Sequence, residues 1–279
     1  MAFTSEISRT NPACLLFLVD QSSSMDKSFG GQPGKKKSEG VADGINRLLQ
    51  NLVLKCAKAD GVRDYFHVGV VGYGEEVKPC LAGTTKDMAL VPISTIANNP
   101  IRLEQRMRVV DDGAGGLVEQ KFRFPVWFEP TAGGKTPMNE AVTLAREVAA
   151  EFIAVYPDCF PPLIINLTDG QPTDANPLDA AVALKGLKST DGNVLFFNAH
   201  LSSTEAAAVC FPSDETGLPD KFARLLFRMS SILPPKLMSA ARDEGFAITG
   251  PARGFVFNGD LVAVVRFLDI GTRVAAPGR

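Results

Sequence analysis

Cysteine and histidine are scarce in this chain of 279 residues. Its five cysteines form no C-x-x-C pair, and their number is odd: Cys14, Cys56, Cys80, Cys159 and Cys210. This pattern argues against a disulfide framework or a zinc site and predicts small buried thiols. The two histidines, His67 and His200, lie in apolar segments. We therefore expect them to pack inside the protein and not to act as catalysts.

The chain also lacks an excess of one charge and any long apolar run. Lys and Arg number 29 against 31 Asp and Glu, so neither nucleic acid nor an anionic membrane surface is expected as a partner. No apolar segment reaches the length of a membrane span, and the N-terminus lacks the charged-then-apolar order of a signal peptide. The sequence therefore predicts a soluble, cytoplasmic protein with no membrane contact.

Four nearly continuous apolar runs predict strands that are buried on both faces, at 14–20, 67–73, 162–169 and 193–200. Segments with apolar residues at three-and-four spacing predict helices at 38–59, 137–156, 177–187, 219–228 and 259–268. This alternation predicts an α/β fold with a doubly wound, mostly parallel Rossmann-like sheet and helices on both faces. We expect a single domain over 1–279, with a core of about 12–269.

One segment breaks the alternation. Apolar and charged residues alternate on both sides of a glycine-rich turn, which predicts an inserted β-hairpin at about 101–128 with one wet face. We expect it to extend the edge of the sheet. The glycine- and lysine-rich stretch 30–37 predicts a flexible loop whose lysines, Lys35 to Lys37, are solvated.

Oxygen-bearing side chains follow the predicted strands. Asp20, Ser22 and Ser24 come after the first strand, Thr136 precedes the helix at 137–156, and Asp169 ends the third strand. Ligands bind beyond the carboxyl ends of strands in such sheets. A set without histidine or cysteine suits a hard cation, first Mg²⁺, with Ca²⁺ or Mn²⁺ as alternatives.

These residues carry a resemblance to a known family. The pattern D-x-S-x-S (20–24), the threonine of G-G-K-T-P (133–137) and the aspartate of T-D-G (168–170) resemble the metal-ion-dependent adhesion site of the von Willebrand factor A domain. The resemblance implies a non-enzymatic module in which the three hydroxyls bind Mg²⁺ directly and the two aspartates act largely through water. A partner's Asp or Glu then completes the coordination.

The chain is most similar in kind to cytosolic bacterial members of that family, including the tellurite-resistance type. This implies a regulatory or stress-response system, with a protein kinase, a PP2C-type phosphatase or an AAA+ ATPase as partner.

Two alternatives stay open. One is an interaction scaffold that binds through the hairpin and the Lys35–Lys37 loop, with a structural or empty metal site. The other is a Mg²⁺-dependent phosphohydrolase with Asp20 as nucleophile, which is disfavoured because Ser22 stands where such enzymes carry a second acid. A phosphate-binding loop ending at Thr136 is excluded because Glu129 replaces its first glycine.

Overall fold

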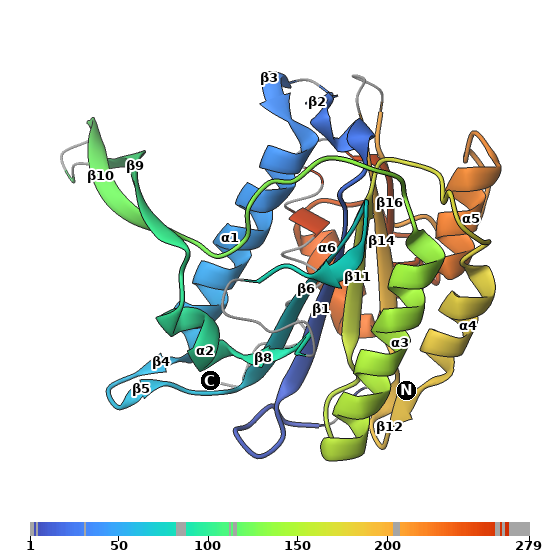
Figure 1. Ribbon diagram of the computed structural model, residues 1–279, viewed down its shortest axis with the longest axis horizontal. Helices are drawn as coiled ribbons and strands as arrows, with labels where there is room; N and C mark the ends of the chain where they lie inside the picture. Colours follow the sequence, from blue (N-terminus) through green and yellow to red (C-terminus); the bar gives the residue numbers. More distant parts are fainter. Residues whose placement is uncertain are drawn as a thin grey trace.

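The computed structural model describes residues 3, 5–30, 32–81, 88–111, 113, 116–202, 207–259, 263, 266 and 267. Within these residues a central sheet of eight strands has the order β15-β16-β14-β11-β1-β6-β7, with β8 also paired to β6 (Figure 1). The five inner strands are parallel, and the edge strands β7, β8 and β15 are antiparallel. The bounds are β1 Ala13–Asp20, β6 Phe66–Tyr73, β7 Val77–Pro79, β8 Val91–Pro92, β11 Leu163–Thr168, β14 Leu195–Leu201, β15 Val209–Cys210 and β16 Phe255–Gly259.

Helices cover both faces of this sheet. One face packs against α1 (Lys37–Cys56), α2 (Ile93–Asn98) and α6 (Pro235–Asp243). The other packs against α3 (Met138–Val155), α4 (Leu178–Gly186) and α5 (Lys221–Met229) (Figure 1). Successive side chains of β1 point to opposite faces, so every residue of this strand is buried. The predicted α/β architecture is confirmed, and the four strands predicted from apolar runs are present as β1, β6, β11 and β14.

Short elements lie outside the sheet. A 3₁₀ turn, η1, covers Ser23–Asp26. Three small antiparallel pairs are β2 (Ser28–Phe29) with β3 (Gln32–Lys36), β4 (Ala57–Lys58) with β5 (Gly61–Val62), and β12 (Lys188–Ser189) with β13 (Gly192–Asn193). The helix predicted at 259–268 lies mostly outside the described residues, and its first residue, Gly259, ends β16. No helix in the described part of the chain combines the length and apolar character needed to span a bilayer.

The hairpin forms, but its predicted place is wrong. Strands β9 (Arg102–Asp111) and β10 (Leu117–Val126) pair with each other in a sheet of their own and project away from the body (Figure 1). The edge beyond β6 is already occupied by β7 and β8. Alternating polarity predicts that two strands pair, but it does not reveal whether a third strand joins them.

The root of the hairpin is tied to the body by α1. The buried Asn46 side chain accepts the backbone N–H groups of Trp127 (2.8 Å) and Phe128 (3.0 Å) and donates to the carbonyl of Phe128 (2.8 Å). The Trp127 indole donates to the Ile96 carbonyl at 2.6 Å. The only tryptophan therefore anchors the hairpin from inside the core.

A chain of buried hydrogen bonds crosses the sheet face that α3–α5 cover. The Tyr73 hydroxyl donates to Asn166 Oδ1 (2.7 Å), and Asn166 Nδ2 donates to Asn198 Oδ1 (3.0 Å). Asn198 Nδ2 then donates to Ser230 Oγ (3.0 Å), which donates to the Leu226 carbonyl (2.8 Å). Each buried polar atom in this chain thereby has a partner, and three strands are joined to the end of α5.

Candidate functional site

Asp20 is the last residue of β1, and its carboxylate is fully buried. Its Oδ1 accepts the N–H of Ser22 (2.8 Å), and its Oδ2 accepts the hydroxyl of Thr168 (2.7 Å). Loss of hydration raises the pKa of Asp20 to about 6, although both hydrogen bonds oppose this rise. A charge held here at such an electrostatic cost is a natural partner for a cation.

The serines connect the first loop to the third strand. The hydroxyls of Ser22 and Ser24 lie 2.9 Å apart, and Ser24 Oγ donates to Asp169 Oδ1 at 2.5 Å. Asp169 follows directly after β11, which pairs in parallel with β1. Parallel pairing brings the two strand ends to the same edge, so residues 145 positions apart in sequence come into contact.

Thr136 joins this group from a second loop. Its N–H donates to Thr173 Oγ1 (2.9 Å), and the N–H of Thr173 donates back to the Thr136 carbonyl (3.0 Å). A Cβ atom added at Gly170 would lie 3.4 Å from Thr136 Oγ1, 3.7 Å from Asp20 Oδ2 and 3.8 Å from Ser24 Oγ. Oxygens from two loops thus face the backbone of a third loop at Gly170, and the lack of a side chain at residue 170 leaves a small space between them.

The donor set in this space fits a hard divalent cation. Three of the five predicted ligands border it, and hydrogen bonds join the other two to them; the five oxygen-bearing residues are Asp20, Ser22, Ser24, Thr136 and Asp169. The described residues contain no group of three or more His, Cys, Asp or Glu side chains placed to hold a metal, and this site offers two carboxylates. Three neutral hydroxyls and two carboxylates match the ligands that Mg²⁺ accepts.

Lys37 is the residue that the sequence interpretation placed wrongly. Its ammonium forms an ion pair with Asp169 Oδ2, and the side chains of Lys37 and Asp169 are only 2% and 1% exposed. Its neighbours behave differently: Lys36 pairs with the exposed Asp26 (2.6 Å), and Lys35 pairs with Asp43 (2.7 Å). The prediction of three solvated lysines is therefore wrong at Lys37.

The sequence does contain a signal for this burial. Lys37 opens α1 and stands four and eight residues before Val41 and Ile45, which are both buried. Positions at this spacing share one face of a helix. Composition alone gives the same prediction for all three adjacent lysines. The position of Lys37 on the buried face of the helix distinguishes it from Lys35 and Lys36.

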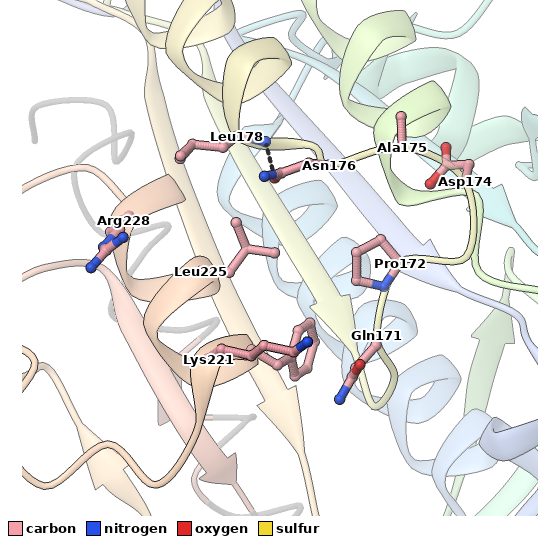
Figure 2. A pocket seen from close by; sticks show the side chains of 10 residues that line it. Gln171, Pro172, Asp174, Ala175, Asn176, Leu178, Lys221, Leu225 and Arg228 are labelled. Carbon is pink, nitrogen blue, oxygen red and sulfur yellow. Dashed lines mark hydrogen bonds between the residues drawn. The ribbon is translucent and has the colours of Figure 1, made fainter.

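A hollow of about 400 Å³ lies beside the site (Figure 2). It begins at Gln171, two residues beyond Asp169, and its far wall is α5 with Lys221, Leu225 and Arg228. Arg228 is engaged with Glu215 through Nε at 2.7 Å. Asp174, on the near rim, accepts the N–H of Glu140 (3.0 Å) in the first turn of α3.

His200 packs near the site. Its ring stacks on Phe257 (4.5 Å between centroids, 13° between planes), and its Nδ1 accepts the N–H of Asn258 at 3.2 Å. Burial lowers the pKa of His200 to about 4. This environment favours the neutral ring and agrees with the expectation that it packs.

This histidine is expected to make the fold sensitive to acid. The unfolded chain takes up the proton near pH 6.5, whereas the folded protein resists it down to about pH 4. Stability is therefore lost as the pH falls through this window. Between pH 7.5 and pH 5, the free energy of unfolding of the wild type should fall by about 2 kcal/mol more than that of His200→Gln. Urea unfolding in chelator checks this; equal pH slopes in the two proteins would contradict it.

No protein-family model and no curated protein matches the chain. Solved structures that are similar to it include the following three. For the PilB minor pilin from Streptococcus sanguinis, the match has 12% identity and a TM-score of 0.45, and covers 95% of this chain and 62% of that one. For proximal thread matrix protein 1 from the mussel byssus, the identity is 17% and the TM-score is 0.42, and the match covers 80% of this chain and 42% of that one. For the vWF domain of the type V pili tip protein Mfa5 from Porphyromonas gingivalis, the identity is 17% and the TM-score is 0.33, and the match covers 58% of this chain and 39% of that one.

The likeness is distant. In each case the chain spans less than two thirds of the length of the solved structure.

Proposed function

We propose that this protein is a divalent-metal-dependent protein–protein interaction module without catalytic activity. Mg²⁺, or Ca²⁺ or Mn²⁺ in its place, is held by Asp20, Ser22, Ser24, Thr136 and Asp169. The observation that carries the proposal is the space beside Gly170, which oxygens of Asp20, Ser24 and Thr136, from two separate loops, surround within 3.8 Å. The motif resemblance to the von Willebrand factor A domain points to the same five residues.

The residues of the site hold the ion largely through neutral oxygens. Ser22, Ser24 and Thr136 contribute no charge, so all of the countercharge among the ligands comes from Asp20 and Asp169. A Mg²⁺ ion in such a set keeps exchangeable water positions that an incoming anionic ligand can take. An Asp or Glu of a partner protein is the ligand that fits this charge best.

The non-enzymatic part of the proposal rests on what surrounds Asp20. Its two oxygens are both engaged as hydrogen-bond acceptors, and the nearby His200 uses Nδ1 to bind backbone. Neither group is arranged to shuttle a proton to a substrate. An assay for Mg²⁺-dependent phosphatase activity separates this reading from the phosphohydrolase alternative.

The proposed cellular system and class of partner follow from the sequence resemblance alone. It suggests a bacterial regulatory or stress-response system in the cytoplasm, with a protein kinase, a PP2C-type phosphatase or an AAA+ ATPase as the acidic partner.

A Ser24→Ala variant tests the metal-bridged mechanism while it keeps every carboxylate. We expect Mg²⁺ binding, measured by calorimetry, to weaken by about tenfold or more, because one direct ligand is lost. Ser23→Ala is the matched control, since Ser23 is exposed and its hydroxyl donates to the Gly134 carbonyl instead. Partner proteins should be retained in Mg²⁺ and released by chelator. Equal Mg²⁺ affinities in Ser24→Ala and the wild type would refute the mechanism.

A second candidate function is binding through the hairpin. On one face Leu103, Met107 and Val109 are 55%, 50% and 60% exposed, and Lys121 pairs directly opposite Met107. Such a face suits a strand of a protein partner that carries apolar and acidic side chains. Loss of partner binding in Met107→Asp, with full binding in Ser24→Ala and in chelator, would favour this candidate over the metal-bridged one.

A further inference from the structure

We propose that Lys37 is a positioning residue that makes the metal site selective for acidic ligands, by offsetting the charge of one of its two carboxylates. This inference rests on the proposed metal site and assigns a role to a residue that lies outside its ligand set.

The geometry places Lys37 behind the site. Its ammonium pairs with Asp169 Oδ2, whereas Ser24 donates to the other oxygen, Oδ1, at 2.5 Å. The two carboxylate oxygens are thus engaged separately, one by the lysine and one by the ligand loop. Lys37 fixes the orientation of Asp169, and among the described residues no hydrogen bond joins its ammonium to Ser22, Ser24 or Thr136.

The burial of this ion pair indicates a role beyond packing. An ammonium loses most of its hydration at 2% exposure, and a methionine or leucine would pack at the same helical position without that loss. Among the described residues, Asp169 is the acid that forms an ion pair with this ammonium. Its clearest consequence is therefore electrostatic and falls on the site that shares this carboxylate.

The charge balance gives the direction of the effect. Asp20, Asp169 and Lys37 together carry about −1, so a bound Mg²⁺ leaves the site at about +1. Without Lys37 the same ion would be neutralised. Lys37 therefore weakens the hold on the cation and strengthens the attraction of the bound cation for an incoming carboxylate.

Lys37→Met tests this with the metal and a simple carboxylate as probes. Mn²⁺ binding is followed by the relaxation of water protons, and acetate is then titrated onto the Mn²⁺-loaded protein at constant ionic strength. We expect Lys37→Met to bind Mn²⁺ about tenfold more tightly than the wild type and to bind acetate several-fold more weakly. Lys37→Arg, which keeps the charge, should resemble the wild type. Lys36→Met is the matched control, because Lys36 pairs with the exposed Asp26.

The outcomes separate the two proposals. Equal Mn²⁺ and acetate affinities in Lys37→Met and the wild type, or weaker Mn²⁺ binding in the variant, overturn the role of Lys37 and leave the metal site standing. Absence of Mn²⁺ binding in every protein overturns the metal site and this inference with it. Circular dichroism confirms folding, and Lys37→Gln replaces Lys37→Met if the latter does not fold.

Discussion

An Asn166→Ala variant is expected to lose about 3–5 kcal/mol of unfolding free energy, because the substitution opens the middle of the buried hydrogen-bond chain. Tyr73 loses the acceptor of its hydroxyl, and Asn198 loses the donor to its side-chain oxygen. Both groups are fully buried, so water cannot replace the missing partner. The small cavity left by the side chain adds to the loss.

Urea unfolding measures this effect, with Asn193→Ala as the control. Asn193 is exposed, and its Nδ2 donates to the Lys185 carbonyl at 2.9 Å, so its removal should cost less than about 1 kcal/mol. A loss below about 1 kcal/mol in Asn166→Ala would show that the chain of hydrogen bonds contributes little to stability.

Asp20→Asn is expected to separate stability from metal binding. Mg²⁺ affinity should fall by about a hundredfold or more, because one of the two charges that attract the ion is removed. In chelator, however, the variant should be at least as stable as the wild type. Desolvation raises the pKa of Asp20, so its charge is unfavourable without a cation, whereas asparagine keeps an oxygen to accept hydrogen bonds from Ser22 or Thr168.

Melting temperatures with Mg²⁺ and with chelator check both halves of this expectation. The wild type should melt higher in Mg²⁺, and Asp20→Asn should show no such rise. Asp26→Asn is the control, since Asp26 is exposed and pairs with Lys36. A Mg²⁺-dependent rise of equal size in Asp20→Asn would exclude Asp20 from the ion's surroundings.

The inner strands could be predicted because a strand that is buried on both faces has a nearly continuous apolar sequence. The positions of the ligand loops could then be predicted too, because the carboxyl ends of parallel strands lie at one edge of the sheet. Two short helices, α2 and α6, were not predicted: six and nine residues contain too few turns to display a period. The strand β16, Phe255–Gly259, was also missed.

Two features of the candidate site's surroundings depended on three-dimensional register. Lys37 is buried because α1 begins at that residue and turns it toward Asp169, and one residue earlier Lys36 stays exposed. The hairpin stands apart because the sheet edge beyond β6 is occupied by other strands. In both cases the local pattern was visible in the sequence, but the sequence did not show which part of the fold would lie next to it.

The closed root of the hairpin has a consequence for how the gene could change. The N–H of Ile101 donates to the carbonyl of Val126 at 2.7 Å, so the chain leaves and re-enters the body at one point. A segment attached in this way can be lengthened, exchanged or deleted in a single event without altering the order of the central strands. The hairpin and the loops at the strand ends are therefore free to change separately.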